Sequence, residues 1–175
     1  MPDGTTAPVN PPGPPTPLVP DPRAQFVALS AALTGFDAAT LHGTGMVATY
    51  YDTLADIVGE RILARLLGAW GRVATMAGGD PGALDTGIRV AILADPTFGP
   101  LARNLMALWY MGQWNQLPAD WRNTNGANAR DTDHIVSSEA YVQGLIWPAV
   151  HSHPQGAKQP GYGSWSLPPD GQEAP

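Results

Sequence analysis

The stretch 95–114, DPTFGPLARNLMALWYMGQW, constrains the fold more than any other part of this chain. It opens with Asp-Pro, which is typical of a helix start, because Asp caps free N–H groups and Pro fits the first turn. Leu101, Leu105 and Leu108 follow at helical spacing, and residues 105–111 contain no polar break. A helix that is apolar on all sides is buried on several of them, and this one is too short to cross a bilayer. We therefore expect the central helix of a small helical domain, part of which faces a partner chain.

The rest of the chain carries similar helix signals. Asp-Pro pairs also begin at Asp21 and Asp80, and Asp37 is a further cap position. Apolar residues repeat at helical spacing after each of them, and the alternation typical of strands is almost missing. These patterns predict an all-α fold, with a single small domain of five or six helices over residues 21–148. The expected helices cover residues 22–33, 38–58, 60–73, 81–94, 95–114 and 132–147, and a loop rich in Asn and Gly covers 115–131.

Proline and glycine dominate both ends of the chain. Residues 1–20 hold eight prolines and few large apolar side chains. Such a segment buries too little surface to offset its ordering entropy, so we expect a Pro-rich arm that lies along a partner. Residues 149–175 have no helical period but contain Tyr162, Gly163 and Trp165. We expect an extended arm that orders by wrapping another subunit, with a disordered tail as the alternative.

Composition excludes several classes of function and favours an interface. The net charge of -6, with Lys158 as the single lysine, argues against binding to a phosphate backbone, and the absence of Cys excludes disulfides and thiolate metal sites. Neither a membrane span nor a signal peptide is visible. Six Trp in a chain with only 14% charged residues leave apolar surface for a partner. The predicted contact residues are Trp109, Tyr110, Trp114, Trp121, Tyr162, Gly163 and Trp165.

Two short motifs have functional and structural interpretations. Residues 43–48, GTGMVA, match the dinucleotide fingerprint GxGxxA, but that motif acts where a strand turns into a helix, and here a helix is expected before it. Close helix packing is the favoured explanation for the glycines. His151 and His153 are spaced like a metal-binding pair, yet no third ligand is implied, so hydrogen bonding or partner contact is the default.

Two further sets of polar residues also have a functional and a structural interpretation. His134 lies beside Asp131 and Asp133 and could form an acid–base cluster with them, although a solvated helix start is favoured. Arg103 and Asn104 interrupt the most apolar helix. We expect an ion pair from Arg103 to one of the candidate carboxylates. These candidates are Asp52, Asp56 and Asp95. No Ser, His and Asp set has the context of a hydrolase, so we expect no catalytic residue in this chain.

Several long phrases, in order, carry a resemblance to a known family. They are LTGFDAATLHGTG, ILADPTFGPLARNLMALWYMGQW, LP-x-x-W at residues 117–121 and IVSSEAYVQGLIWPAVHSHPQGAKQPGYGSW. Together they resemble the small subunit of membrane-bound FAD-dependent sugar and polyol dehydrogenases, of the sorbitol and fructose dehydrogenase type. The similarity covers residues 26–165.

The resemblance implies a periplasmic complex of three subunits. A large flavoprotein of the glucose-methanol-choline oxidoreductase type holds FAD and oxidises the sugar, and a multihaem cytochrome c subunit, which carries haem c, passes electrons to ubiquinone and anchors the assembly. The small subunit is then a noncatalytic partner for maturation, stability and export, with no cofactor or metal of its own. Small subunits of this family usually begin with a twin-arginine signal, whereas this sequence begins MPDGTTAPVN.

Two other functions stay open from the sequence alone. One is a transient export or folding escort that is absent from the mature complex. The other is a free-standing metal-dependent enzyme that uses His151, His153 and a carboxylate.

Overall fold

Aspartate caps divide the first half of the chain into its helices. In the computed structural model, which describes residues 21–154, the carboxylates of Asp21, Asp37 and Asp80 each accept a backbone N–H from two or three residues further on, at 2.6–3.1 Å. Each satisfies a donor that the helix itself leaves free. The helices of this half are α1 (Pro22–Thr34), α2 (Ala38–Gly43), α3 (Val47–Val58), α4 (Glu60–Ala77) and α5 (Pro81–Ile88), followed by a π-helical turn, η1 (Arg89–Leu93).

The central helix is α6 (Phe98–Met111), and it contacts α1, α3, η1, α8 and α9. Leu101, Leu105 and Leu108 are fully buried, as their spacing predicts. The helix begins at Phe98 rather than directly after Asp95, whose Oδ1 accepts the N–H groups of Thr97 and Phe98, both at 2.8 Å. The predicted cap is therefore present, one turn before the regular helix.

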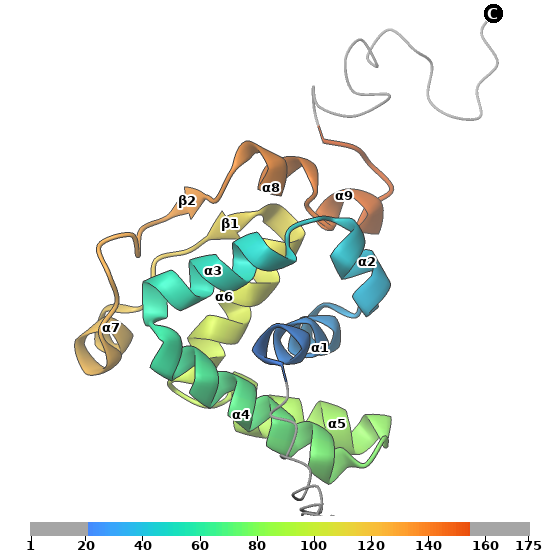
Figure 1. Cartoon of the computed structure of the whole chain (residues 1–175), viewed down its shortest axis with the longest axis vertical. Helices are drawn as coiled ribbons and strands as arrows, with labels where there is room; N and C mark the ends of the chain where they lie inside the picture. The colour runs from blue at the N-terminus through green and yellow to red at the C-terminus, as the bar shows by residue number, and fades with distance from the viewer. Residues whose placement is uncertain (1–20, 155–175) are drawn as a thin grey trace, which may run out of the picture.

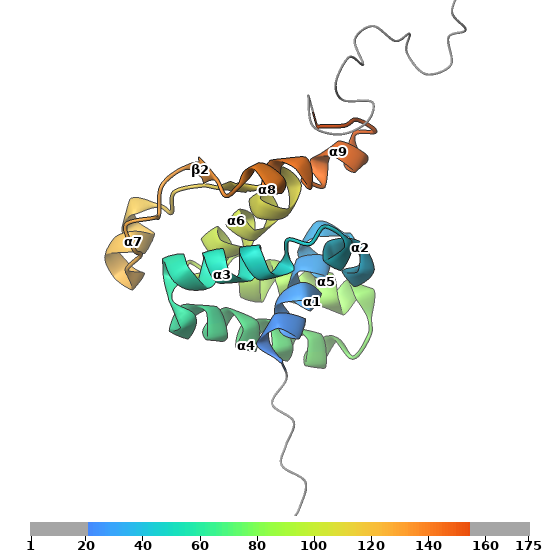
Figure 2. The same cartoon turned by 45° about the horizontal axis from the view of Figure 1, so that its top comes forward.

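The helices pack as a mostly helical single domain around one apolar core (Figure 1). α4 and α5 form a helical hairpin along the lower edge in that view, and α1 contacts both α4 and α6. In the turned view of Figure 2, α8 and α9 lie on the other side of the molecule from α4. Within residues 21–154 no helix is long and apolar enough to cross a bilayer.

Two predicted elements of the first half differ in detail. The helix expected over residues 38–58 breaks into α2 and α3 at Gly45, which takes a positive φ of +72°, and α3 ends at Gly59, whose φ is +81°. The helix expected over 81–94 changes from α5 to the wider η1 at Arg89. Glycine accounts for the break in the first case, since it adopts positive φ without a steric penalty.

The predictions for residues 115–147 are partly wrong. The expected loop over 115–131 contains α7 (Ala119–Asn125), and the helix expected over 132–147 is not continuous. A two-residue strand, β2 (His134–Ile135), pairs antiparallel with β1 (Gln113–Trp114), and the short helices α8 (Ser138–Val142) and α9 (Ile146–Ala149) follow. The predicted N-terminal arm over 1–20 lies outside the described residues, and so does the predicted C-terminal arm over 149–175 from residue 155 onward.

Candidate functional site

Three of the tryptophans predicted to contact a partner lie in the core. Trp109, Trp114 and Trp121 are 1%, 0% and 4% exposed. The ring of Trp109 meets Tyr50 edge to face with centroids 4.9 Å apart, and the indole N–H of Trp121 donates to the Thr97 carbonyl at 2.8 Å. Packing against other elements of the same chain accounts for these rings, so the prediction that they contact a partner does not fit their burial.

Tyr110 is half-buried at the end of α6. Its hydroxyl donates to the Thr34 carbonyl of α1 at 2.8 Å, and its ring meets Phe36 edge to face with centroids 6.0 Å apart. It therefore ties α6 to the turn between α1 and α2. Its contact with a partner stays a prediction, and Tyr162, Gly163 and Trp165 lie outside the described residues.

Four buried side-chain polar atoms lack a hydrogen-bond partner among residues 21–154: Ser30 Oγ, Arg122 Nε, the Tyr50 hydroxyl and the indole N–H of Trp109. The last two belong to rings that are in contact. Burial raises the pKa of the Tyr50 hydroxyl above its usual value. Tyr50 and Trp109 are each 1% exposed, so neither the hydroxyl nor the indole N–H reaches the surface, and the pair belongs to the core.

Asp131 is the centre of the most buried polar network in the described residues. Its side chain is 1% exposed, and Oδ1 accepts the indole N–H of Trp114 at 2.9 Å and the backbone N–H of Leu117 at 3.0 Å. Oδ2 lies 3.8 Å from Nε of Arg122. That distance is too long for a hydrogen bond but short enough for an ion pair. Because every oxygen faces a donor of the same chain, this carboxylate fixes the loop.

The acid–base cluster proposed around His134 does not form. Asp131 is committed to the network just described, and Asp133 accepts the backbone N–H of Gln116 at 2.6 Å. Nδ1 of His134 lies 2.6 Å from the Thr132 carbonyl, so the imidazole is held by its own loop. The alternative, a solvated helix start, is also wrong, because β2 begins at His134.

Asn104 and Arg103 have opposite roles on α6. Asn104 is buried and forms a two-way bridge, donating from Nδ2 to the Asn115 carbonyl at 2.9 Å and accepting the Asn115 N–H at 2.8 Å. Arg103 is exposed, and the ion pair predicted for it is absent from the described part of the chain. Asp52 binds Arg23 and Asp56 binds Arg130 instead.

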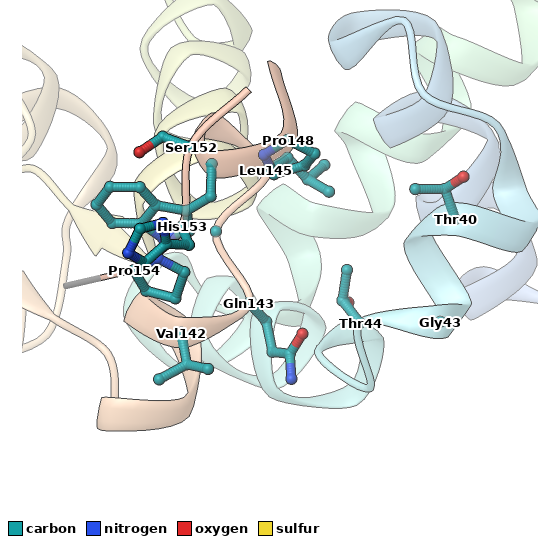
Figure 3. Close-up of a pocket in the computed structure, with 12 residues that line it drawn as sticks. Thr40, Gly43, Thr44, Val142, Gln143, Leu145, Pro148, Ser152, His153 and Pro154 are labelled. Carbon is teal, nitrogen blue, oxygen red and sulfur yellow. The ribbon is translucent and has the colours of Figure 1, made fainter. Parts of the chain in front are cut away.

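A pocket of about 350 Å³ opens between α2 and the turns around α8 and α9 (Figure 3). Thr40 and Thr44 line it on the α2 side, and Gln143, Ser152 and His153 line it on the other. Hydroxyl, amide and imidazole groups can hold a polar ligand by hydrogen bonds, and no carboxylate lines this pocket. His153, one of the two histidines predicted as possible metal ligands, lines this pocket.

The histidine pair is separated by this geometry. His153 is half-buried and lines the pocket, whereas His151 is exposed, takes a left-handed conformation at φ +53° and does not line it. Within residues 21–154 no group of three His, Asp or Glu side chains is placed to hold a metal ion. The structure therefore adds no third ligand to the predicted pair.

The GxGxxA motif lies in the turn between α2 and α3. Thr44 Oγ1 donates to the Leu41 carbonyl at 2.8 Å and accepts the Met46 N–H at 3.1 Å, which closes the turn. Helix α2 rather than a strand precedes the motif. The strand-to-helix context that a dinucleotide site needs is thus missing here.

Comparisons with known proteins add no family to these observations. A scan against protein-family models, a search of the curated proteins and a search of the solved structures each find no match to this chain.

Proposed function

We propose that this chain is the noncatalytic small subunit of a heteromeric FAD-dependent sugar or polyol dehydrogenase. It binds the flavoprotein large subunit, stabilises it and assists its maturation and export. FAD belongs to the large subunit and haem c to the cytochrome subunit, and the complex acts in the periplasm. The observation that carries this proposal is the set of long phrases, in order, that resemble such small subunits.

The positions of these phrases in the fold support one shared role for most of them. They fall on α2 and its flanking turns, on α6 with β1, on the start of α7, and on the segment from β2 to α9. Most of these elements are neighbours: β1 pairs with β2, α6 contacts α8 and α9, and the pocket of Figure 3 lies between α2 and the turns around α8 and α9. Three of the four phrases therefore lie on neighbouring elements, whereas the phrase at residues 117–121 leads into α7, on the other side of the molecule from α2 and α9 (Figure 1).

Binding supplies a mechanism that needs no catalytic group. A chain that binds the native flavoprotein and not its unfolded form shifts the folding equilibrium by mass action, by about 2.7 kcal/mol at a concentration 100 times the Kd. The predicted contacts are the half-buried Tyr110 and, in the arm, Tyr162, Gly163 and Trp165. Aromatic side chains suit such a role because they bury a large area at low entropic cost.

Alanine at both Tyr162 and Trp165 tests this proposal. We expect the double variant to lose co-elution with the flavoprotein subunit in size-exclusion chromatography, because two central aromatics each contribute about 2 kcal/mol or more at an interface. Met111→Ala is the matched control, since Met111 is an exposed apolar side chain outside the predicted contact set. A double variant that still elutes with the flavoprotein at the same stoichiometry would remove the arm from the proposal.

A further inference from the structure

The arginines of this acidic chain fall into two groups. Arg23, Arg89, Arg122 and Arg130 each lie within 4 Å of a carboxylate. The other four arginines of residues 21–154, Arg61, Arg65, Arg72 and Arg103, have no carboxylate partner within that part of the chain. Three of these four share one helix, α4, which carries Glu60 as its single carboxylate. In a chain with a net charge of -6, such a basic face is an exception.

The three arginines form a line on the exposed side of α4. Arg61, Arg65 and Arg72 are spaced i, i+4 and i+11, so they lie on one face of a helix with 3.6 residues per turn. The guanidinium of Arg65 lies 5.6 Å from the ring centroid of Phe98, which holds its position without neutralising its charge. Met76 continues the same line one turn beyond Arg72 and is 86% exposed.

An apolar groove adjoins the C-terminal end of this line, at Met76. It has a volume of about 490 Å³ and lies between the end of α4 and the outer side of α5 and η1. Val73 and Met76 form one wall, and Ala83 and Val90 form the other, with Val90 70% exposed. Gly87 lets the walls approach, because a Cβ there would lie 2.7 Å from Cγ1 of Val73. The carboxylates of α5 are already engaged: Asp80 caps the helix and Asp85 binds Arg89.

We infer that this α4 face, defined as Arg61, Arg65, Arg72, Met76 and the adjoining groove, docks an acidic amphipathic segment of a partner protein. Apolar side chains of the segment fill the groove, and its carboxylates face the three guanidinium groups. Charge complementarity of this kind fixes the register of a partner and speeds its association. The inference goes beyond the proposed function, because the α4 face lies across the molecule from the end where α8 and α9 lie (Figures 1 and 2).

Charge decides among the possible occupants of the groove. Residues 1–20 contain a single carboxylate, Asp3, and residues 155–175 contain Asp170, Glu173 and the basic Lys158, so neither end of this chain supplies three negative charges. An anionic membrane or a nucleic acid needs more positive charge than three arginines on a chain of net charge -6. A protein segment with several carboxylates and an apolar stripe meets both requirements.

Photocrosslinking of the full chain in its native host tests the inference. With p-benzoylphenylalanine in place of Met76, we expect a crosslink to a segment of another protein that mass spectrometry shows to be rich in Asp and Glu with apolar residues at helical spacing. The triple variant Arg61→Glu, Arg65→Glu, Arg72→Glu should reduce this crosslink at least about ten-fold, because three opposed charges at an interface turn from attraction to repulsion. Reversing the carboxylates of the crosslinked segment should restore it.

The triple variant Arg23→Glu, Arg103→Glu, Arg130→Glu is the control. It changes the net charge by the same amount at exposed arginines outside the α4 face, and it should leave the crosslink unchanged. A crosslink within the chain, to a second copy or to lipid would overturn the inference, as would no crosslink at all or one that the Arg61, Arg65 and Arg72 reversal leaves intact. The identity of the partner also separates this test from the proposed function: an acidic segment outside the flavoprotein supports the α4 face whatever the flavin experiment shows.

Discussion

Asp131→Ala is expected to lower the free energy of unfolding by about 2 to 6 kcal/mol, because it leaves two buried donors without an acceptor. The substitution leaves the indole N–H of Trp114 and the backbone N–H of Leu117 buried without an acceptor, and it leaves Arg122 without its ion pair. Each buried donor left unpaired costs about 1 to 3 kcal/mol. Urea unfolding followed by tryptophan fluorescence measures the change.

Asp133→Ala is the matched control for that experiment. Asp133 lies in the same loop and also accepts a backbone N–H, from Gln116, but it is exposed. Water replaces an exposed acceptor, so we expect a loss of about 1 kcal/mol or less. Equal losses for the two variants would contradict the view that the Asp131 network holds the loop to the helical core.

Gly112→Ala is expected to cost about 2 to 5 kcal/mol, from two separate causes. Gly112 ends α6 in a left-handed conformation at φ +67°, which costs about 1 to 2 kcal/mol for a residue with a side chain. A Cβ there would also lie 2.5 Å from the backbone carbon of Ala140, so α8 has to move, at a further cost of about 1 to 3 kcal/mol. Thermal unfolding measured by circular dichroism gives the sum of the two.

Gly78→Ala separates these causes. Gly78 ends α4 with φ +57°, and a Cβ there meets no atom within 4 Å. We expect only the conformational part of the cost, about 1 to 2 kcal/mol. If Gly112→Ala cost no more than Gly78→Ala, the close packing of α6 against α8 would be wrong.

Local chemistry made much of the fold predictable. The caps at Asp21, Asp37, Asp80 and Asp95 each accept the backbone N–H groups that a helix start leaves free, a rule that needs only neighbouring residues. The apolar stripe of α4 and the burial of α6 followed from their periodicity. Where the local pattern was mixed, as at residues 132–147, the prediction of one helix was wrong.

The errors have a common physical cause, which is contact between residues far apart in the chain. Trp114 pairs with His134 across the strands and donates to Asp131, and neither contact is encoded in the spacing of the residues around it. The same contacts bury Trp114. The composition predicts these tryptophans at a surface that binds a partner, whereas in the structure they fill the space between the helices and the loop.

The α4 face could also be predicted from the sequence only in part. The i, i+4 spacing of Arg61 and Arg65 places them on one face of α4, and that much is visible in the sequence. Whether an arginine has a carboxylate partner depends on tertiary structure, as the pairs Arg23 with Asp52 and Arg130 with Asp56 show. The predicted pair for Arg103 failed for this reason.

Co-expression with a glucose-methanol-choline type flavoprotein subunit from the same genome, with and without this chain, tests the proposed function most directly. The readouts are size-exclusion chromatography and the flavin absorbance of the eluted flavoprotein. We expect co-elution at fixed stoichiometry with FAD bound, and loss of flavin when this chain is omitted. A flavoprotein that elutes alone, holds its FAD and is equally active in both cases would contradict the proposed function.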